Sequence, residues 1–231
     1  MTLASIPVLF ARNIIQNGMA KEPEYYRRNM PHWQPSDGVY HLVMRLYGSL
    51  PRAVVLRLQQ EHQRRVTELE QSGFDELECK MLLRQEQEFY FGKFDALLDA
   101  GQTGPKWLKD DWIATAVRDC FLYWHEKQHF KLVALSVMPN HIHAIAYKIQ
   151  RPLFRILQTI KTYTAKQANE MLFQHGTHFW QRETYDHLIR NRKEFENQIR
   201  YVLMNPVKAG LVQDWKDWEF TWLNADFRAV W

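Results

Sequence analysis

The sequence predicts an α+β fold of the ferredoxin-like type: a βαββαβ antiparallel sheet with helices on one face, plus an inserted helical hairpin. Two β-rich segments, 130–138 and 141–149, are joined only by Pro139 and Asn140. A connection this short requires an antiparallel hairpin. A further segment, 39–47, alternates with a period of two, and helical periodicity separates it from the hairpin. Strands and helices therefore alternate in the order that this fold requires.

The elements follow one another with recognisable start and stop signals. Asp75 stands at the head of a long helix and Gly101 just past its end, while Pro206 is expected to terminate the last helix. In chain order we expect a strand at 39–47, two charged helices over about 51–100, a helix at 110–128, strands at 130–138 and 141–149, a helix at 151–172, an extended segment at 178–189 and a helix from Asn191. The charged helices are either an arm on the core or a part of it.

These elements suggest a division of the chain into three parts. The N-terminal segment is 1–38, the core is 39–205 with its helical insertion at about 51–100, and the C-terminal tail is 206–231. At 231 residues and 46% hydrophobic composition, the chain can bury a sizeable core. No apolar run approaches the roughly 18 to 20 residues of a membrane span, so the expected location is the cytoplasm.

Charge and cysteine usage narrow the function further. Cys79 and Cys120 lie far apart without a CxxC spacing, which argues against a disulfide framework or a thiolate zinc site. Residues 148–208 carry eleven basic and five acidic side chains, so this segment holds +6 of a chain whose net charge is +4. This excess favours a polyanionic partner such as nucleic acid, although a solvated helix face has the same composition.

A pair of histidines follows the two-residue turn. Side chains alternate along a strand, so His141 and His143 face the same way and can contact one metal ion, whereas two packed core histidines are the alternative. As ligands, both rings should face an open cleft. A hydrolase of the histidine-triad type would need a third histidine at position 145, where Ile145 stands.

Three separated motifs carry a family resemblance. The segments "MPNHIH", "FWQRETYDHLIRN" and "YVLMNPVKAGLV" closely resemble the REP-associated tyrosine transposases, a branch of the single-tyrosine HUH (IS200-like) transposases. The resemblance covers most of the chain from about Arg27. It implies a metal-dependent single-stranded DNA endonuclease and strand transferase that acts on hairpin (REP-like) DNA through a 5′-phosphotyrosine intermediate.

The resemblance also implies site residues. Tyr201 corresponds to the nucleophile, and His141, His143 and Asn205 to the ligands of a divalent metal, Mg²⁺ or Mn²⁺. The spacing agrees independently, because residues at i and i+4 share one face of a helix. The alternatives are a packed Tyr201 with Asn205 as a helix C-cap, and Tyr163 as the nucleophile.

The expected partner is single-stranded or hairpin DNA, with neither a membrane nor a protein partner, and the protein is expected to be a monomer or a homodimer. Planar side chains interleaved with cations suit an unpaired strand. The DNA-binding candidates are Arg27, Arg28, Trp180, Arg182, Tyr185, His187, Arg190, Arg192 and Lys193. Core packing remains an alternative for Trp180. A catalytically silent hairpin-binding protein and a nuclease that uses water are the rival functions.

Overall fold

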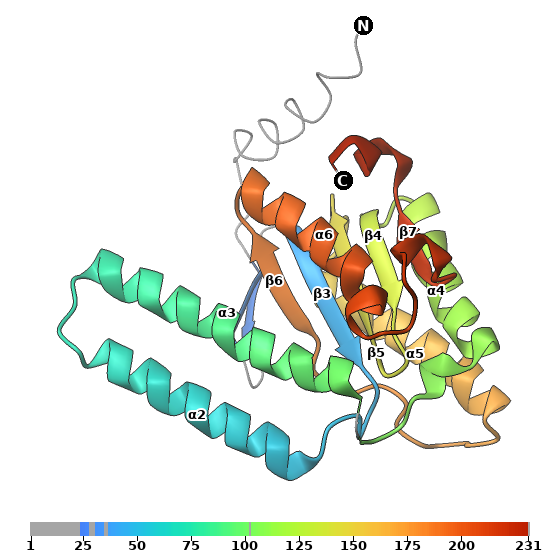
Figure 1. Cartoon of the computed structure of the whole chain (residues 1–231), viewed down its shortest axis with the longest axis horizontal. Coiled ribbons are helices and arrows are strands. Elements are labelled where there is room, and N and C mark those ends of the chain that lie inside the picture. The colour runs from blue at the N-terminus through green and yellow to red at the C-terminus, as the bar shows by residue number, and fades with distance from the viewer. Residues whose placement is uncertain (1–23, 28–30, 35–36, 102, 231) are drawn as a thin grey trace, which may run out of the picture. The chain divides into compact units, whose positions relative to one another are not determined.

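The computed structural model describes residues 24–27, 31–34, 37–101 and 103–230, which form two compact units (Figure 1). The second unit is Gly48–Lys106, and the chain on either side of it forms the first. The site described below is built from the first unit alone.

The first unit is organised around a five-stranded antiparallel sheet. The strands are β3 (Val39–Arg45), β4 (Lys131–Val137), β5 (His141–Tyr147), β6 (Tyr185–Ile189) and β7 (Thr221–Leu223), in the spatial order β6-β3-β5-β4-β7. With α4 after β3 and α5 after β5, the first four of these strands realise the βαββαβ order. The predicted fold class is confirmed.

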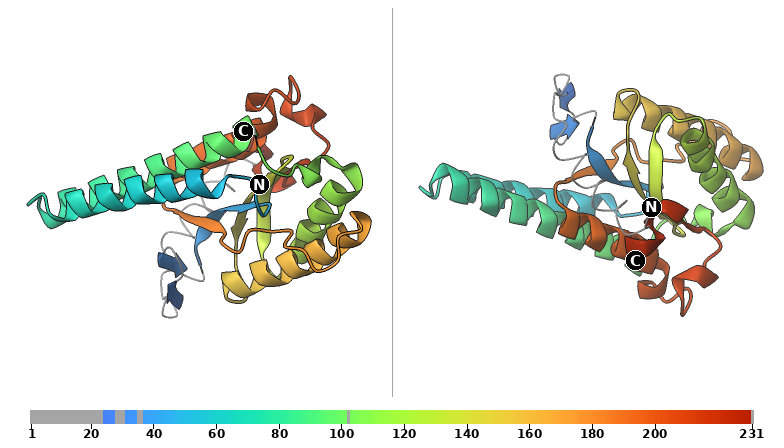
Figure 2. Two further views of the ribbon diagram at one scale, coloured as in Figure 1. Left: turned by 90° about the horizontal axis from the view of Figure 1, so that it is seen from below. Right: turned by 90° about the horizontal axis from the view of Figure 1, so that it is seen from above.

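Helices cover both faces of this sheet (Figure 2). Helices α4 (Asp111–Glu126) and α5 (Leu153–Met171) pack on one face, and α6 (Arg192–Lys208) packs on the other. The two helices of the βαββαβ unit therefore share one face, as predicted, whereas α6 covers the other face. The reason lies in β5, where every residue is buried: Ile142 belongs to the cluster with α4 and α5, and Ile145 to the cluster with α6.

Helix α6 also runs further than the sequence predicts. Asn191 caps its first turn by accepting from the Glu194 amide at 2.9 Å. Pro206 was expected to end the helix but lies inside it, and the last residue is Lys208. Proline removes one donor, yet the Ala209 amide still donates to the Asn205 carbonyl at 2.9 Å, so the helical bonding continues past the ring.

Three short strands lie in segments for which no strand was predicted. Strand β7 pairs with the edge of β4, where Leu135 lies opposite Trp222. Strands β1 (Glu24–Arg27) and β2 (Pro31–Gln34) form a separate antiparallel pair. Strands of three or four residues give almost no periodic signal, so the sequence alone cannot mark them.

The second unit is a helical hairpin of α2 (Arg52–Glu70) and α3 (Glu76–Ala100). Asp75 caps α3 as predicted, accepting from two backbone amides of its first turn. The two helices are joined by His62, whose ring stacks on Tyr90 at 4.4 Å between centroids and whose Nδ1 lies 3.1 Å from the Glu86 carboxylate. Within the described residues, no helix of either unit is long and apolar enough to cross a membrane.

Candidate active site

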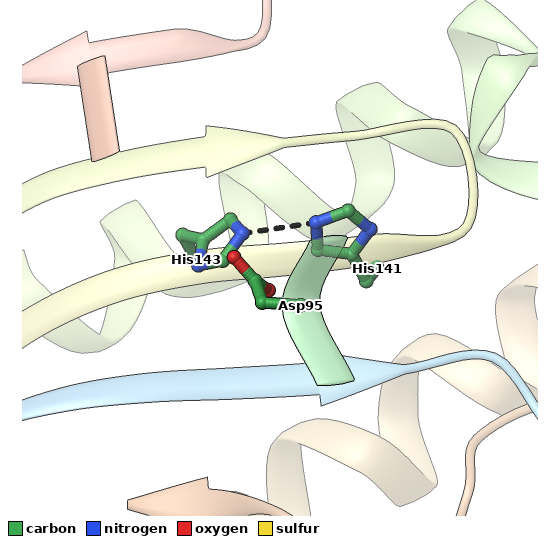
Figure 3. Close-up of side chains that lie close together, drawn as sticks. All are labelled: Asp95, His141 and His143. Atoms are coloured by element: carbon green, nitrogen blue, oxygen red, sulfur yellow. Dashed lines mark hydrogen bonds between the residues drawn. The ribbon is translucent and has the colours of Figure 1, made fainter. Parts of the chain in front are cut away.

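The two predicted histidines lie at the start of β5 with their rings side by side (Figure 3). The turn before them is closed by the Met138 amide, which donates to the His141 carbonyl at 2.8 Å. The Nε2 atoms of His141 and His143 are 2.9 Å apart, so the two rings converge on one point. Figure 3 also draws Asp95, a residue of α3 in the second unit.

Two further polar side chains hold the other nitrogens of these rings. The Nδ1 of His141 lies 2.6 Å from the Asn140 carboxamide oxygen. The Nδ1 of His143 lies 3.0 Å from the Nε2 of His41, which projects from β3 on the same face of the sheet. Asn140 and His41 therefore flank the histidine pair, each beside one Nδ1 atom.

Burial keeps these imidazoles neutral. Desolvation lowers the pKa of His141 to about 3. It also lowers the pKa of His41 to about 3, an effect that His187 reinforces and the Gln198 side chain opposes. For His143 the pKa falls well below its usual value, first through burial and then through its two histidine neighbours. Neutral imidazole is the form that binds metal ions.

The rings of the two histidines do not reach solvent, as they would if they faced an open cleft. His141 and His143 are both 0% exposed. Their surroundings nevertheless differ from an apolar core, because the rings contact Asn140, His41 and Tyr201. The site is therefore a buried polar cluster.

Helix α6 brings Tyr201 to this cluster. Its ring centroid lies 5.6 Å from that of His143 and 5.9 Å from that of His41, in edge-to-face arrangements. The Lys208 ammonium lies 4.7 Å from the Tyr201 ring centroid. Tyr163, the rival nucleophile, is 54% exposed on α5, which packs on the opposite face of the sheet.

Asn205 lies one helical turn beyond Tyr201 and is completely buried. Among the described residues, neither its side-chain oxygen nor its side-chain nitrogen has a hydrogen-bond partner. The C-cap of α6 is Ala209, so capping does not explain the asparagine. A buried carboxamide left unsatisfied is costly, so a functional reason for Asn205 is expected.

The two histidines fit a divalent cation. Two ligand atoms at right angles around an ion, each about 2.1 Å from it, lie about 3.0 Å apart. The separation of 2.9 Å between the two Nε2 atoms matches that spacing. The two neutral imidazoles can therefore contribute two ligands to such an ion.

Two of the DNA-binding candidates, Trp180 and Arg182, lie beside α5, and they differ in exposure. Trp180 is 7% exposed and donates from its indole to the Thr164 hydroxyl at 2.8 Å, as core packing requires. Arg182 is exposed. Both line a groove of about 320 Å³ between α5 and the segment 177–184.

The remaining candidates lie on or beside β6. Tyr185 and His187 are half-buried with parallel rings, and His187 pairs with the Glu194 carboxylate at 2.6 Å. Arg190 and Lys193 are exposed, and Arg192 is ion-paired with a glutamate of its own helix. Arg27 ends β1, while Arg28 lies outside the described residues.

Sequence reasoning overlooked His41, Gln198 and Lys208. The period-2 pattern of the first strand includes His41, but a histidine in a strand that is remote in sequence gives no sign that it will contact another. Gln198 lies three residues before Tyr201, a helical spacing that could have identified it.

A family comparison matches the segment that carries the site. Residues 104–204, which include the histidine pair and Tyr201, match the family described as "Transposase IS200 like". This segment is therefore similar to that transposase family, as the motifs predicted.

Two relatives of the chain carry more specific names. Over 115 residues, 45% of this chain, it is 30% identical to the "Putative REP-associated tyrosine transposase" of Haemophilus influenzae, of which 65% is covered. Over 101 residues, 42% of this chain, it is 27% identical to the "REP-associated tyrosine transposase" of Escherichia coli, of which 56% is covered. The matches thus span less than two thirds of either relative.

A solved structure described as a REP-associated tyrosine transposase bound to a REP hairpin is also similar. It shares 18% sequence identity and a TM-score of 0.47, with 86% of this chain and 81% of that chain covered.

Proposed function

We propose that this protein is a metal-dependent endonuclease and strand transferase that acts on single-stranded DNA carrying a short imperfect hairpin. One observation carries the proposal: the Tyr201 ring packs against His143 while the Nε2 atoms of His141 and His143 converge at 2.9 Å. The proposed nucleophile thereby lies beside the two proposed metal ligands. The two REP-associated relatives support the same reading.

His141, His143 and Asn205 would hold the ion. A bound Mg²⁺ or Mn²⁺ would offset the negative charge that develops on the non-bridging oxygens of the scissile phosphate. The protein groups prepare for this binding in two ways. Burial keeps His141 neutral over the working pH range, and the Asn140 carboxamide fixes the orientation of its ring.

Tyr201 is the proposed nucleophile. Its hydroxyl oxygen attacks phosphorus, the bond from phosphorus to the 3′ oxygen breaks, and that oxygen takes up a proton and leaves as a 3′-hydroxyl. The 5′-phosphate remains on the tyrosine, so the energy of the phosphodiester is retained and a second 3′-hydroxyl can reverse the step. Lys208 places a positive charge beside the ring to which the phosphate becomes attached.

Exposed cations are the proposed contacts to the DNA backbone. Arg182, Arg190 and Lys193 lie at the surface of the first unit, within the segment that carries the excess positive charge. Phosphate contacts supply affinity without sequence information. We place the protein in the cytoplasm, where its substrate would be, and as a monomer or homodimer.

A catalytically silent hairpin-binding protein is the alternative. The test is incubation with a library of labelled single-stranded oligonucleotides that carry short imperfect hairpins, in Mn²⁺. Strand transfer through a tyrosine requires a covalent adduct that survives SDS. This adduct should not form when EDTA is present during the incubation. Salt-sensitive binding with neither an adduct nor cleavage would favour the silent protein instead.

A further inference from the structure

His41 is the third histidine of the buried cluster, and no role has yet been assigned to it. It comes from β3, where it pairs with His187 of β6 and Ile145 of β5 in the sheet register. Its side chain is 0% exposed, and its Nε2 lies 3.0 Å from the Nδ1 of His143. A fully buried histidine that contacts a proposed metal ligand is expected to have a role at the site.

The two ligand rings are held in the same manner. In each ring the Nδ1 atom has a protein partner, which is the Asn140 oxygen for His141 and the His41 Nε2 for His143. In each ring the Nε2 atom then points to the shared position between them. The nitrogen that binds a metal is set by the hydrogen bond that the other nitrogen makes.

The tautomers follow from this arrangement. For the Nε2 lone pair of His143 to face an ion, the proton must be on Nδ1, which then donates to the Nε2 of His41. His41 must then carry its own proton on Nδ1, the nitrogen that does not face His143. All three rings remain neutral.

We infer that His41 is a positioning residue that fixes the orientation and tautomer of His143, so that the Nε2 of His143 is available to the divalent cation. His41 does not bind the ion, because its Nε2 is already directed at the Nδ1 of His143. The His41 ring also packs edge-to-face against the Tyr201 ring, with centroids 5.9 Å apart. The same side chain therefore contacts the proposed nucleophile. The inference rests on the proposed metal site.

The test compares two substitutions in the full-length, metal-free protein. His41→Gln keeps a side-chain oxygen that can accept from His143, whereas His41→Leu removes the acceptor and keeps a buried side chain of similar bulk. Mn²⁺ affinity is measured by calorimetry after circular dichroism has shown that each variant is folded. We expect His41→Leu to weaken Mn²⁺ binding by about 10- to 100-fold and His41→Gln to recover most of the loss.

A control histidine separates this effect from general loosening. His125 on α4 packs on the opposite face, where its Nδ1 accepts from the Leu132 amide at 3.2 Å. The His125→Leu variant should leave Mn²⁺ affinity within about twofold of the wild type, because this residue does not contact His143.

A second readout reports the tautomer directly. Side-chain ¹⁵N NMR of the metal-free wild type should show His143 protonated at Nδ1, and His41→Leu should shift it toward the Nε2 tautomer. Folded His41→Leu with wild-type Mn²⁺ affinity, or with an unchanged His143 tautomer, would overturn the inference. Wild-type protein that binds no Mn²⁺ would overturn it together with the metal site. Intact Mn²⁺ binding without a DNA adduct would instead overturn only the proposed strand transfer.

Discussion

Replacing Asn205 by Leu should make the metal-free protein more stable while weakening its hold on a divalent cation. The Asn205 carboxamide is 0% exposed, and its oxygen and nitrogen have no partner among the described residues. Leucine is close to asparagine in size and has no polar atom to satisfy. The substitution therefore separates the cost of burying the amide from its proposed use as a ligand.

The magnitude follows from the burial of the amide. A buried polar group without a partner costs about 1–3 kcal/mol, and leucine favours an α-helix over asparagine by a few tenths of a kcal/mol. The free energy of unfolding in EDTA should thus rise by about 1–3 kcal/mol, reduced by any overpacking from the larger side chain. At a Mn²⁺ concentration of about 100 times Kd, ligand binding adds about 2.7 kcal/mol to the wild type. In Mn²⁺ the wild type should therefore be as stable as Asn205→Leu, or more stable.

Urea unfolding in EDTA and in Mn²⁺ measures both quantities, and Asn224 supplies the matched control. This asparagine is 9% exposed, and its side chain donates to the Leu132 carbonyl at 3.1 Å and accepts from the Asp226 amide at 3.0 Å. The Asn224→Leu variant should lose about 1–3 kcal/mol because it leaves both groups unpaired. If Asn205→Leu loses a similar amount in EDTA, the Asn205 carboxamide is a structural group and the reasoning is wrong.

Three further predictions concern the histidines and the charged surface. His143→Ala should abolish cleavage and Mn²⁺ binding in a folded protein; wild-type cleavage would remove it from the ligands. Because burial lowers the pKa of His41 to about 3 from about 6.5 in the unfolded chain, the unfolded state binds more protons between these pH values. Stability of the metal-free protein should therefore fall as the pH drops through that window. Urea unfolding should show a shallower decline for His41→Gln, and parallel declines would contradict the assignment. Removing the charge of Arg190 or Lys193 should reduce the slope of log K against log salt by about one each in a fluorescence binding assay, whereas unchanged slopes would exclude them as phosphate contacts.

Local patterns were sufficient to predict much of the fold. The two-residue turn at Pro139 and Asn140 required a hairpin, and the alternation along 39–47 marked β3. Local patterns could not predict the face of the sheet on which α6 packs. That face depends on Ile145 and Val133 sharing one buried cluster with Val202 and Leu203, which are remote in sequence.

The candidate site shows the same division. The i, i+2 spacing of His141 and His143 and the i, i+4 spacing of Tyr201 and Asn205 are local, so the sequence could predict a shared face in each pair. The contact of His41 with His143 joins residues 102 positions apart and depends on the pairing of β3 with β5. Periodicity within one strand carries no information about such a pairing.

The most direct test of the account is to locate the covalent bond between protein and DNA. Wild-type protein is incubated with single-stranded hairpin oligonucleotides and Mn²⁺, the SDS-resistant adduct is isolated, and its digested peptides are sequenced by mass spectrometry. We expect a 5′-phosphonucleotide on Tyr201, no adduct in folded Tyr201→Phe despite retained DNA binding, and a normal adduct in Tyr163→Phe. An adduct on Tyr163, or metal-dependent cleavage that continues in Tyr201→Phe without any adduct, would contradict it.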